Sequence, residues 1–197
     1  MNAFLSGLNG KILAAGGAVA AVIVAGLLYT MMAPVHAVPA PPGAIARLEP
    51  LKEPAPVPTV AFNDASGRRH TLAEFKGRYV LLNLWATWCA PCVRELPSLA
   101  GLQAAIPGLK IVAVNVGRGS ASDAAAFLKA HHAGSLPVYM DSDIALIRVF
   151  GAFGLPYSIL IDPQGREVAR AVGPGAWDAP DAVDYFRALT LKTSGAS

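Results

Sequence analysis

Cysteine is scarce in this chain: Cys89 and Cys92 are the only two among 197 residues. Two cysteines exclude a small scaffold held together by several disulfides, so stability must come from a hydrophobic core. A four-ligand zinc site is disfavoured, because the sequence has neither a second C-x-x-C pair nor a nearby pair of histidines. Covalent haem attachment requires His directly after the second cysteine, where this chain has Val93.

Charged residues are also few, at 15% against a typical share of about 25%. The deficit is concentrated near the N-terminus, where Lys11 is the only charged side chain before Arg47. From Val57 onward positive and negative charges nearly balance, and no basic stripe occurs. The net charge of +3 therefore gives no indication of nucleic-acid binding.

A long uncharged run, Ile12–Ala33, lies near the N-terminus. As a helix it would span roughly 33 Å at about 1.5 Å per residue, enough for the core of a bilayer. We therefore predict that residues 1–33 form a cytoplasmic N-terminus and a transmembrane anchor, with Lys11 on the cytoplasmic side. The rest of the chain would then lie across the membrane, where disulfides persist. A cleaved signal peptide is the alternative, because Val35-His36-Ala37 and Val38-Pro39-Ala40 resemble cleavage sites.

Proline dominates the next segment, since residues 34–58 hold eight prolines and few large apolar side chains. Because proline favours an extended, semi-rigid chain, we interpret residues 34–56 as a linker between the anchor and a folded domain. A proline-rich ligand for another protein is the alternative. The folded domain is predicted to occupy residues 57–192, and residues 193–197 are expected to form a frayed tail.

Short apolar segments alternate with helical patterns throughout this domain. Strands are expected at 60–62, 79–85, 110–116, 137–140, 157–161 and 167–172, and helices at 72–75, 89–105, 122–133, 144–150 and 178–189. The turn Asp162-Pro163-Gln164-Gly165 predicts a hairpin between the last two strands. This order of elements predicts an α/β domain in which helices cover the faces of a sheet.

Both cysteines fall where a buried strand is expected to turn into a helix. The apolar run Tyr79–Trp85 precedes them, and the spacing of Val93, Leu96 and Leu99 after them is helical. The first turn of a helix has unpaired N–H groups and a positive dipole end, which stabilise a thiolate and make a cysteine nucleophilic. A structural disulfide is the competing interpretation, but a bridge that closes so short a loop removes little chain entropy. The pattern therefore favours a redox-active pair.

Several segments, taken in order, resemble one family. The run W-C-A-P-C at a strand-to-helix turn, followed later by Gly154-Leu155-Pro156 before a strand, resembles the thioredoxin fold. The N-terminal apolar run, the segment from Thr59 to Cys89, the later L-P-Y-S-I-L-I-D-P-Q-G-R-E and the stretch 172–177 resemble its TlpA-like branch. Members of this branch are membrane-anchored thiol–disulfide proteins of the bacterial periplasm. The similarity covers about residues 57–190 and implies a central mixed sheet flanked by helices.

The resemblance also implies roles for individual residues. Cys89 would be the exposed attacking thiol, and Cys92 would be the resolving thiol. Pro156 would be a cis proline packed against the disulfide, turning the backbone of Leu155 toward a partner that pairs as an extra strand. The surface on which the partner docks would consist of Trp88, Pro91, Leu155 and Pro156.

The sequence departs from the family pattern at two positions. Tyr157 stands where this branch commonly has Thr, which puts the partner surface in doubt but not the chemistry. Asn83 stands where cytoplasmic thioredoxins have a buried Asp, and an amide cannot accept a proton. Glu95, one helical turn after Cys92, resembles the acidic residue that membrane-anchored relatives hold near the active site. Its alternative is a surface position paired with Arg94 or Lys110.

The function implied by the resemblance is disulfide reduction in specific apoproteins. Such proteins need neither an organic cofactor nor a metal, because the Cys89–Cys92 pair carries the electrons. By analogy, the substrates would be apocytochrome c or the copper-assembly proteins of cytochrome oxidase. A transmembrane thiol reductant would supply the electrons. The chain itself would be anchored in the bacterial inner membrane, with its folded domain in the periplasm.

Two other functions remain open at this point. A disulfide-donating oxidase would use the same residues, because sequence motifs do not fix the direction of electron flow. A copper-binding assembly factor would use the two thiols as soft ligands. That function requires a third ligand, typically His near the later strands, and no His occurs after Ala133.

Overall fold

The computed structural model of the chain describes residues 38–194. The predicted membrane anchor, Ile12–Ala33, and residues 195–197 lie outside that range. Between residues 38 and 194, no helix has both the length and the hydrophobicity needed to cross a membrane.

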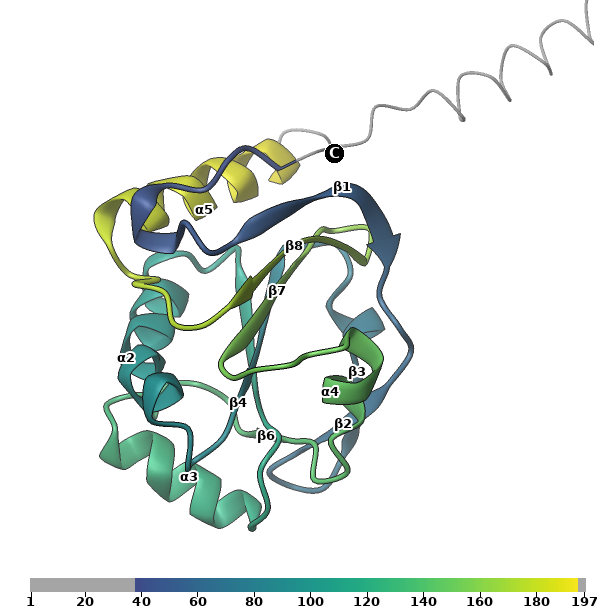
Figure 1. Cartoon of the computed structure of the whole chain (residues 1–197), viewed down its shortest axis with the longest axis vertical. Helices are drawn as coiled ribbons and strands as arrows, with labels where there is room; N and C mark the ends of the chain where they lie inside the picture. The colour runs from purple at the N-terminus through teal and green to yellow at the C-terminus, as the bar shows by residue number, and fades with distance from the viewer. Residues whose placement is uncertain (1–37, 195–197) are drawn as a thin grey trace, which may run out of the picture. The chain divides into compact units, whose positions relative to one another are not determined.

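One mixed β-sheet forms the centre of the described part of the chain (Figure 1). Within residues 38–194 it has eight strands in the order β1-β8-β7-β4-β5-β6-β2-β3. The pairs β4–β5 and β5–β6 are parallel, and the other neighbours are antiparallel. The strands are β1 (Glu49–Pro56), β2 (Ala61–Asp64), β3 (Arg69–Thr71), β4 (Val80–Trp85), β5 (Lys110–Asn115), β6 (Tyr139–Met140), β7 (Tyr157–Ile161) and β8 (Arg166–Val172).

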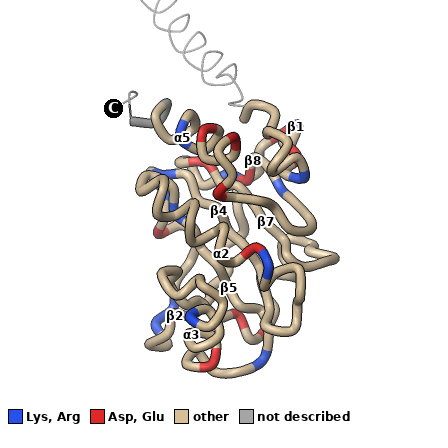
Figure 2. The backbone as a smooth tube through the Cα atoms, turned by 90° about the vertical axis from the view of Figure 1, so that its left-hand side faces the viewer, with Lys and Arg blue, Asp and Glu red and all other residues tan. Residues whose placement is uncertain are grey.

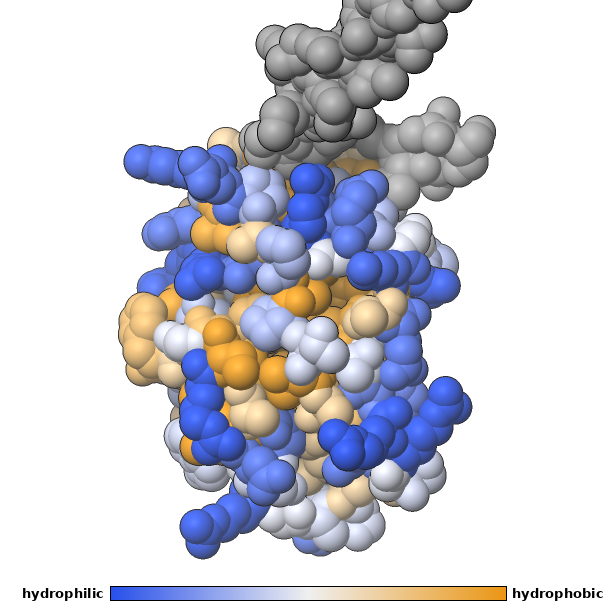
Figure 3. All heavy atoms as spheres, turned by 90° about the vertical axis from the view of Figure 1, so that its right-hand side faces the viewer, coloured by the Kyte–Doolittle hydropathy of each residue, from blue (hydrophilic) through white to orange (hydrophobic). Residues whose placement is uncertain are grey.

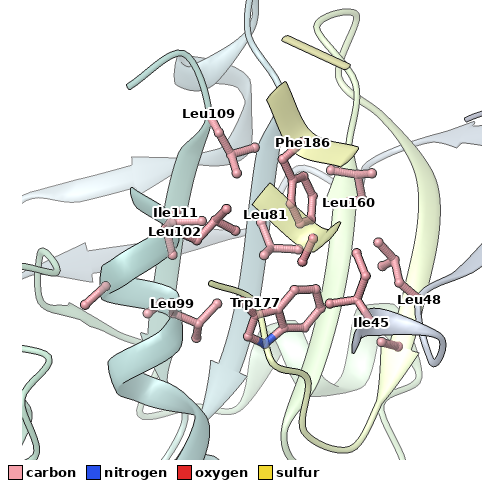
Figure 4. Packing of buried hydrophobic residues seen from close by; sticks show 14 of the residues in the cluster. Ile45, Leu48, Leu81, Leu99, Leu102, Leu109, Ile111, Leu160, Trp177 and Phe186 are labelled. Carbon is pink, nitrogen blue, oxygen red and sulfur yellow. The ribbon is translucent and has the colours of Figure 1, made fainter. Parts of the chain in front are cut away.

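Helices cover both faces of this sheet. They are the 3-10 helices η1 (Gly43–Ile45) and η2 (Leu72–Phe75), and the α-helices α2 (Ala90–Ala105), α3 (Ala121–Ala130), α4 (Ala145–Phe150) and α5 (Pro180–Ser194). Alternate residues of β4 point to opposite faces, as the pleat of a strand requires. Leu81 (Figure 4) and Trp85 join the core under α2, α3 and α5. Leu82 and Leu84 join the core under α4 and η2. The predicted α/β sheet with helices on its faces is therefore confirmed.

The predicted hairpin joins β7 to β8, and its turn residues explain its geometry. The Asp162 carboxylate accepts hydrogen bonds from the backbone N–H groups of Gln164, at 3.0 Å, and Arg166, at 2.9 Å. Gly165 has φ of 80°, a left-handed conformation that glycine adopts at little cost. The turn holds β7 beside β4, where Tyr157 pairs with Leu84. The start of β7 therefore lies next to the end of β4, which leads to the cysteines.

The interpretation of residues 34–56 as a linker is wrong for the described residues 38–56, which belong to the folded domain. Ile45 and Leu48 are buried in the core beside α5 and β8 (Figure 4). The following residues form β1, which pairs with β8. An edge strand has one side without a pairing partner, so prolines without an N–H are tolerated there. The prolines among residues 49–56 therefore belong to an edge strand rather than to a spacer.

The C-terminal boundary also differs from the prediction. Helix α5 continues to Ser194, so the expected frayed tail does not begin at Thr193. The short strand β3 at the other edge of the sheet was not expected as a separate strand, and it pairs only with β2. The remaining predicted elements occur at their expected places, with ends shifted mostly by one to three residues.

Candidate active site

The two cysteines form a disulfide at the junction between β4 and α2. Cys89 is the N-cap residue of α2, and Cys92 lies in its first turn. Their sulfur atoms are 2.07 Å apart, and their Cα atoms are 5.3 Å apart. The Cys89 side chain is 5% exposed and that of Cys92 is fully buried. The predicted exposed position of Cys89 is therefore wrong, although Cys89 is the less deeply buried of the two cysteines.

The helix start favours a negative charge on Cys89. The backbone N–H of Cys92 donates a hydrogen bond to Cys89 Sγ at 3.3 Å. The dipole of α2 also places its positive end at this residue. When the disulfide is reduced, these donors stabilise a thiolate on Cys89 and leave Cys92 as the buried thiol. This arrangement fits an attacking and a resolving cysteine.

Apolar residues flank Cys89 in the sequence and line a hollow beside its neighbour Trp88. Trp88, directly before it, is 73% exposed, and Pro91 is partly exposed at the start of α2. A hollow of about 360 Å³ lies beside Trp88, and its other lining residues are Val116, Ile144, Ile147, Ala152, Gly154 and Leu155. On the α4 side of the domain, hydrophobic residues gather at the centre of the face (Figure 3). A docking polypeptide would thus meet a mainly apolar surface.

The peptide bond between Leu155 and Pro156 is cis, as the family resemblance implies. Pro156 is buried directly before β7, and its carbonyl accepts a hydrogen bond from the Gly173 N–H at 2.9 Å. Leu155 lines the apolar hollow and packs against the core that contains both cysteines. The structure therefore brings Trp88, Leu155 and Pro156 to the same side of the domain as the disulfide.

Glu95 lies inside the protein and not at the surface. It and Arg94 are the two charged residues of α2 (Figure 2), but Glu95 is only 2% exposed. Its carboxylate accepts three hydrogen bonds, and all three donors are neutral. They are Asn83 Nδ2 at 2.7 Å, Trp177 Nε1 at 2.9 Å and the Gly175 backbone N–H at 3.0 Å. The alternative in which Glu95 is a surface residue paired with Arg94 or Lys110 is therefore wrong.

Burial raises the pKa of Glu95, and its hydrogen bonds only partly oppose this effect. The bond from Trp177 opposes it most, followed by those from Gly175 and Asn83. A hydrogen bond to a charged group contributes about 1.5–3 kcal/mol, whereas burying a charge costs several kcal/mol. Glu95 and Cys92 are three residues apart on α2, so their side chains are neighbours on one face. A carboxylate with a raised pKa next to the buried thiol can accept the proton that this thiol must lose.

Asn83 donates a hydrogen bond to Glu95, and its neutral amide cannot itself accept a proton. The Asn83 side chain points from β4 into the same interior and also donates a hydrogen bond to Ser158 Oγ at 3.0 Å. Its Oδ1 atom is buried and has no hydrogen-bond partner within the described residues. The ionisable group absent from this strand position is therefore provided by α2.

Sequence reasoning missed two residues of this site, Gly175 and Trp177. The stretch that contains them was noted only for its resemblance to the TlpA-like branch. A Cβ atom on Gly175 would lie 2.9 Å from the Trp177 ring, so this backbone position requires glycine. The sequence does place a tryptophan shortly after the run Gly173-Pro174-Gly175, but this pattern does not show which group the indole contacts.

No group of three or more His, Cys, Asp or Glu side chains that could hold a metal ion occurs among residues 38–194.

We expect Glu95→Gln to change how stability depends on pH. Because the folded state raises the pKa of Glu95 above its ordinary value of 4.5, its favourable contribution is complete below that pH. The contribution declines as pH rises through the raised folded pKa and is constant above it. Glutamine does not titrate, so the unfolding free energy of Glu95→Gln relative to that of wild type should increase as pH rises from 4.5 through the raised folded pKa. The slope is at most about 1.4 kcal/mol per pH unit, the limit for one proton.

Denaturant unfolding of the oxidised proteins between pH 4 and 8 measures this difference. Glu53→Gln is the matched control, because Glu53 lies at an exposed position of β1. A difference between Glu95→Gln and wild type that stays constant with pH would contradict the raised pKa of Glu95.

Comparison with known proteins places this geometry in a family. The AhpC/TSA family matches residues 53–169. The thiol-disulfide oxidoreductase ResA of Bacillus subtilis (strain 168) is 34% identical over 127 residues, which are 64% of this chain and 70% of that protein.

Solved structures agree with this assignment. A crystal structure described as a thiol:disulfide interchange protein DsbE from Chlorobium tepidum matches with a TM-score of 0.62 at 30% identity, covering 71% of this chain and 99% of that one. The thioredoxin domain of a Bacteroides vulgatus thiol-disulfide oxidoreductase shows the same fold, with a TM-score of 0.59 at 23% identity over 69% of this chain and 96% of that one. The chain therefore belongs to the AhpC/TSA family, as a TlpA-like thiol–disulfide oxidoreductase of the thioredoxin fold.

Proposed function

We propose that this oxidoreductase works as a reductase, delivering two electrons to disulfides in specific apoproteins of the bacterial periplasm. The observation that carries the exchange chemistry is the buried Glu95 carboxylate one helical turn from the buried Cys92, and the family resemblance suggests the reductive direction. Disulfide reduction in a partner requires Cys92 to lose its proton inside the protein, and Glu95 is placed to accept it. The substrates that the family resemblance suggests are apocytochrome c and the copper-assembly proteins of cytochrome oxidase.

The reaction begins with the reduced pair and a partner disulfide. The Cys89 thiolate attacks one partner sulfur, forming an intermolecular disulfide and releasing the other partner sulfur as a thiolate. Cys92 then gives its proton to Glu95 and attacks Cys89 Sγ. The Cys89–Cys92 disulfide forms, the intermolecular bond breaks, and the second partner sulfur leaves as a thiolate. The partner has gained two electrons, and a transmembrane thiol reductant would restore the dithiol.

The apolar surface around Cys89 suits a polypeptide substrate. Trp88 and Pro91 flank Cys89 in the sequence, and aromatic side chains supply contact area for docking partners. Leu155 lies at the edge of the hollow, directly before Pro156. An extended partner segment could pair with the backbone there as an added strand while its disulfide approaches Cys89.

Two other functions use the same residues differently. A disulfide-donating oxidase would run the reaction in reverse and would need a more positive potential. A copper-binding assembly factor would need further ligands beside the two sulfurs.

A trapping experiment tests the proposed roles of the cysteines. In cells, Cys92→Ser should accumulate intermolecular disulfides through Cys89, because the resolving thiol is lost. Non-reducing gels and mass spectrometry after pull-down identify the partners. Cys89→Ser is the matched control and should trap nothing and lose exchange activity. Trapping by Cys89→Ser instead would reverse the assignment of the two thiols.

The reduction potential distinguishes a reductase from an oxidase. Relatives with C-x-x-C pairs span about −270 to −120 mV, and we expect this chain to lie below about −200 mV. Equilibration of the full-length chain with dithiol and disulfide buffers, followed by alkylation of free thiols, gives the value. A potential near −120 mV would favour the oxidase.

The location that we propose is the bacterial inner membrane, with the folded domain in the periplasm. It is supported by the uncharged run Ile12–Ala33 and by the positive charge of Lys11 before it, which favours an N-terminus in the cytoplasm. We expect the full-length chain to remain in the membrane fraction after a carbonate wash, with its C-terminal domain accessible to protease from the periplasm. A soluble periplasmic product that begins at Val38 would identify the run as a cleaved signal peptide.

A further inference from the structure

The loop from β8 to α5 returns to the active-site helix. It leaves β8 at Gly173 and brings two donors, the Gly175 backbone N–H and the Trp177 indole, to the same carboxylate oxygen of Glu95. The donors lie 3.0 Å and 2.9 Å from Oε2, and they are 80 and 82 residues from Glu95 in the sequence. A loop that is remote in sequence therefore completes the surroundings of the carboxylate.

The Trp177 indole is held from several sides. Its ring is 1% exposed and lies between Leu99 of α2 and Ile45 of η1 (Figure 4). It also packs against the Phe186 ring, with centroids 6.2 Å apart. The Trp177 backbone N–H donates to Ser98 Oγ at 3.3 Å, so its main chain is tied to α2 as well. The direction of its Nε1–H is therefore fixed by packing.

Trp85 provides an internal comparison. It is also 1% exposed, but its Nε1 has no hydrogen-bond partner among the described residues. Trp85 contributes packing alone, stacked near Phe127 with ring centroids 5.8 Å apart. Of these two buried tryptophans, only Trp177 has its polar atom directed at an ionisable group.

We propose that Trp177 is a positioning residue for thiol–disulfide exchange, whose indole N–H holds the Glu95 carboxylate in place to receive the Cys92 proton. Gly175 assists through its backbone N–H, because the absence of a Cβ lets the loop approach the indole ring. This inference rests on the proposed role of Glu95 and extends it to the β8–α5 loop. Loss of the indole donor removes the strongest hydrogen-bond stabilisation of the ionised carboxylate, so Glu95 would be ionised only at higher pH.

In the oxidised protein, the groups named here that lie around Glu95 do not titrate with it. From β4 it faces the neutral side chain of Asn83, which also donates a hydrogen bond to Ser158 of β7, and on its own helix the titratable neighbour is Cys92. Asp178, next to Trp177, lies against Gly101, further along α2. In the oxidised protein Cys92 cannot titrate, because it is in the disulfide.

The first experiment uses indole N–H resonances of the full-length oxidised chain, labelled with ¹⁵N-tryptophan in detergent micelles. Three indole signals are expected, from Trp85, Trp88 and Trp177. The Trp177 signal should shift with pH as Glu95 titrates, and the shift should vanish in Glu95→Gln. The buried Trp85 signal should stay constant. A Trp177 signal that is constant in wild type between about pH 4 and 9 would overturn the proposal without affecting partner trapping by Cys92→Ser.

The second experiment measures the exchange rate against pH for Trp177→Phe. Phenylalanine keeps an aromatic ring and removes the donor, so the rising limb of the profile should move upward by about one pH unit. Trp85→Phe is the matched control, since it removes equal volume from another buried tryptophan and should leave the midpoint unchanged. Equal profiles for both variants would reduce Trp177 to a packing residue. If Glu95→Gln had a wild-type profile, the proposed role of Glu95 would fail instead.

Discussion

A carboxylate inside a protein must find hydrogen-bond donors, and the arrangement of this active site follows from how Glu95 finds them. Its three donors come from β4 and from the β8–α5 loop, so these segments must meet at α2. None of the donors carries a charge. A cation in their place would hold Glu95 ionised through the pH range in which the protein works, and the carboxylate could not exchange a proton. Neutral donors hold the group in place but leave it able to titrate.

The central part of the fold could be predicted because its signals are local. The apolar run that becomes β4, the C-x-x-C pair at the start of α2 and the turn at Asp162 each act within a few residues. Edge strand β1 was missed because its pairing depends on β8, more than a hundred residues later, while its prolines indicate an extended linker. Local propensity cannot reveal a partner at that distance.

The same distinction applies to the site. Cys89, Cys92 and the cis peptide before Pro156 lie in recognisable motifs, so the family resemblance was enough to assign them. The spacing from Cys92 indicated where Glu95 lies, but not whether it is buried. Its burial depends on Trp177, 82 residues away, whose contact is set by how α5 and its loop pack on α2. Sequence therefore indicated where the disulfide lies, whereas the structure was needed to show the hydrogen bonds around the carboxylate.

The prolines of β1 have a consequence for which partners the sheet can accept. Pro50, Pro54 and Pro56 have no amide hydrogen, and Lys52 adds a charge to the same strand. Such residues blunt an exposed edge against pairing with foreign strands and so discourage aggregation. A polypeptide that seeks main-chain pairing is thus turned away from this edge, while the backbone before Pro156 remains available beside the disulfide. If partners pair with the backbone before Pro156, as proposed, the composition of β1 would help to keep that pairing beside the disulfide.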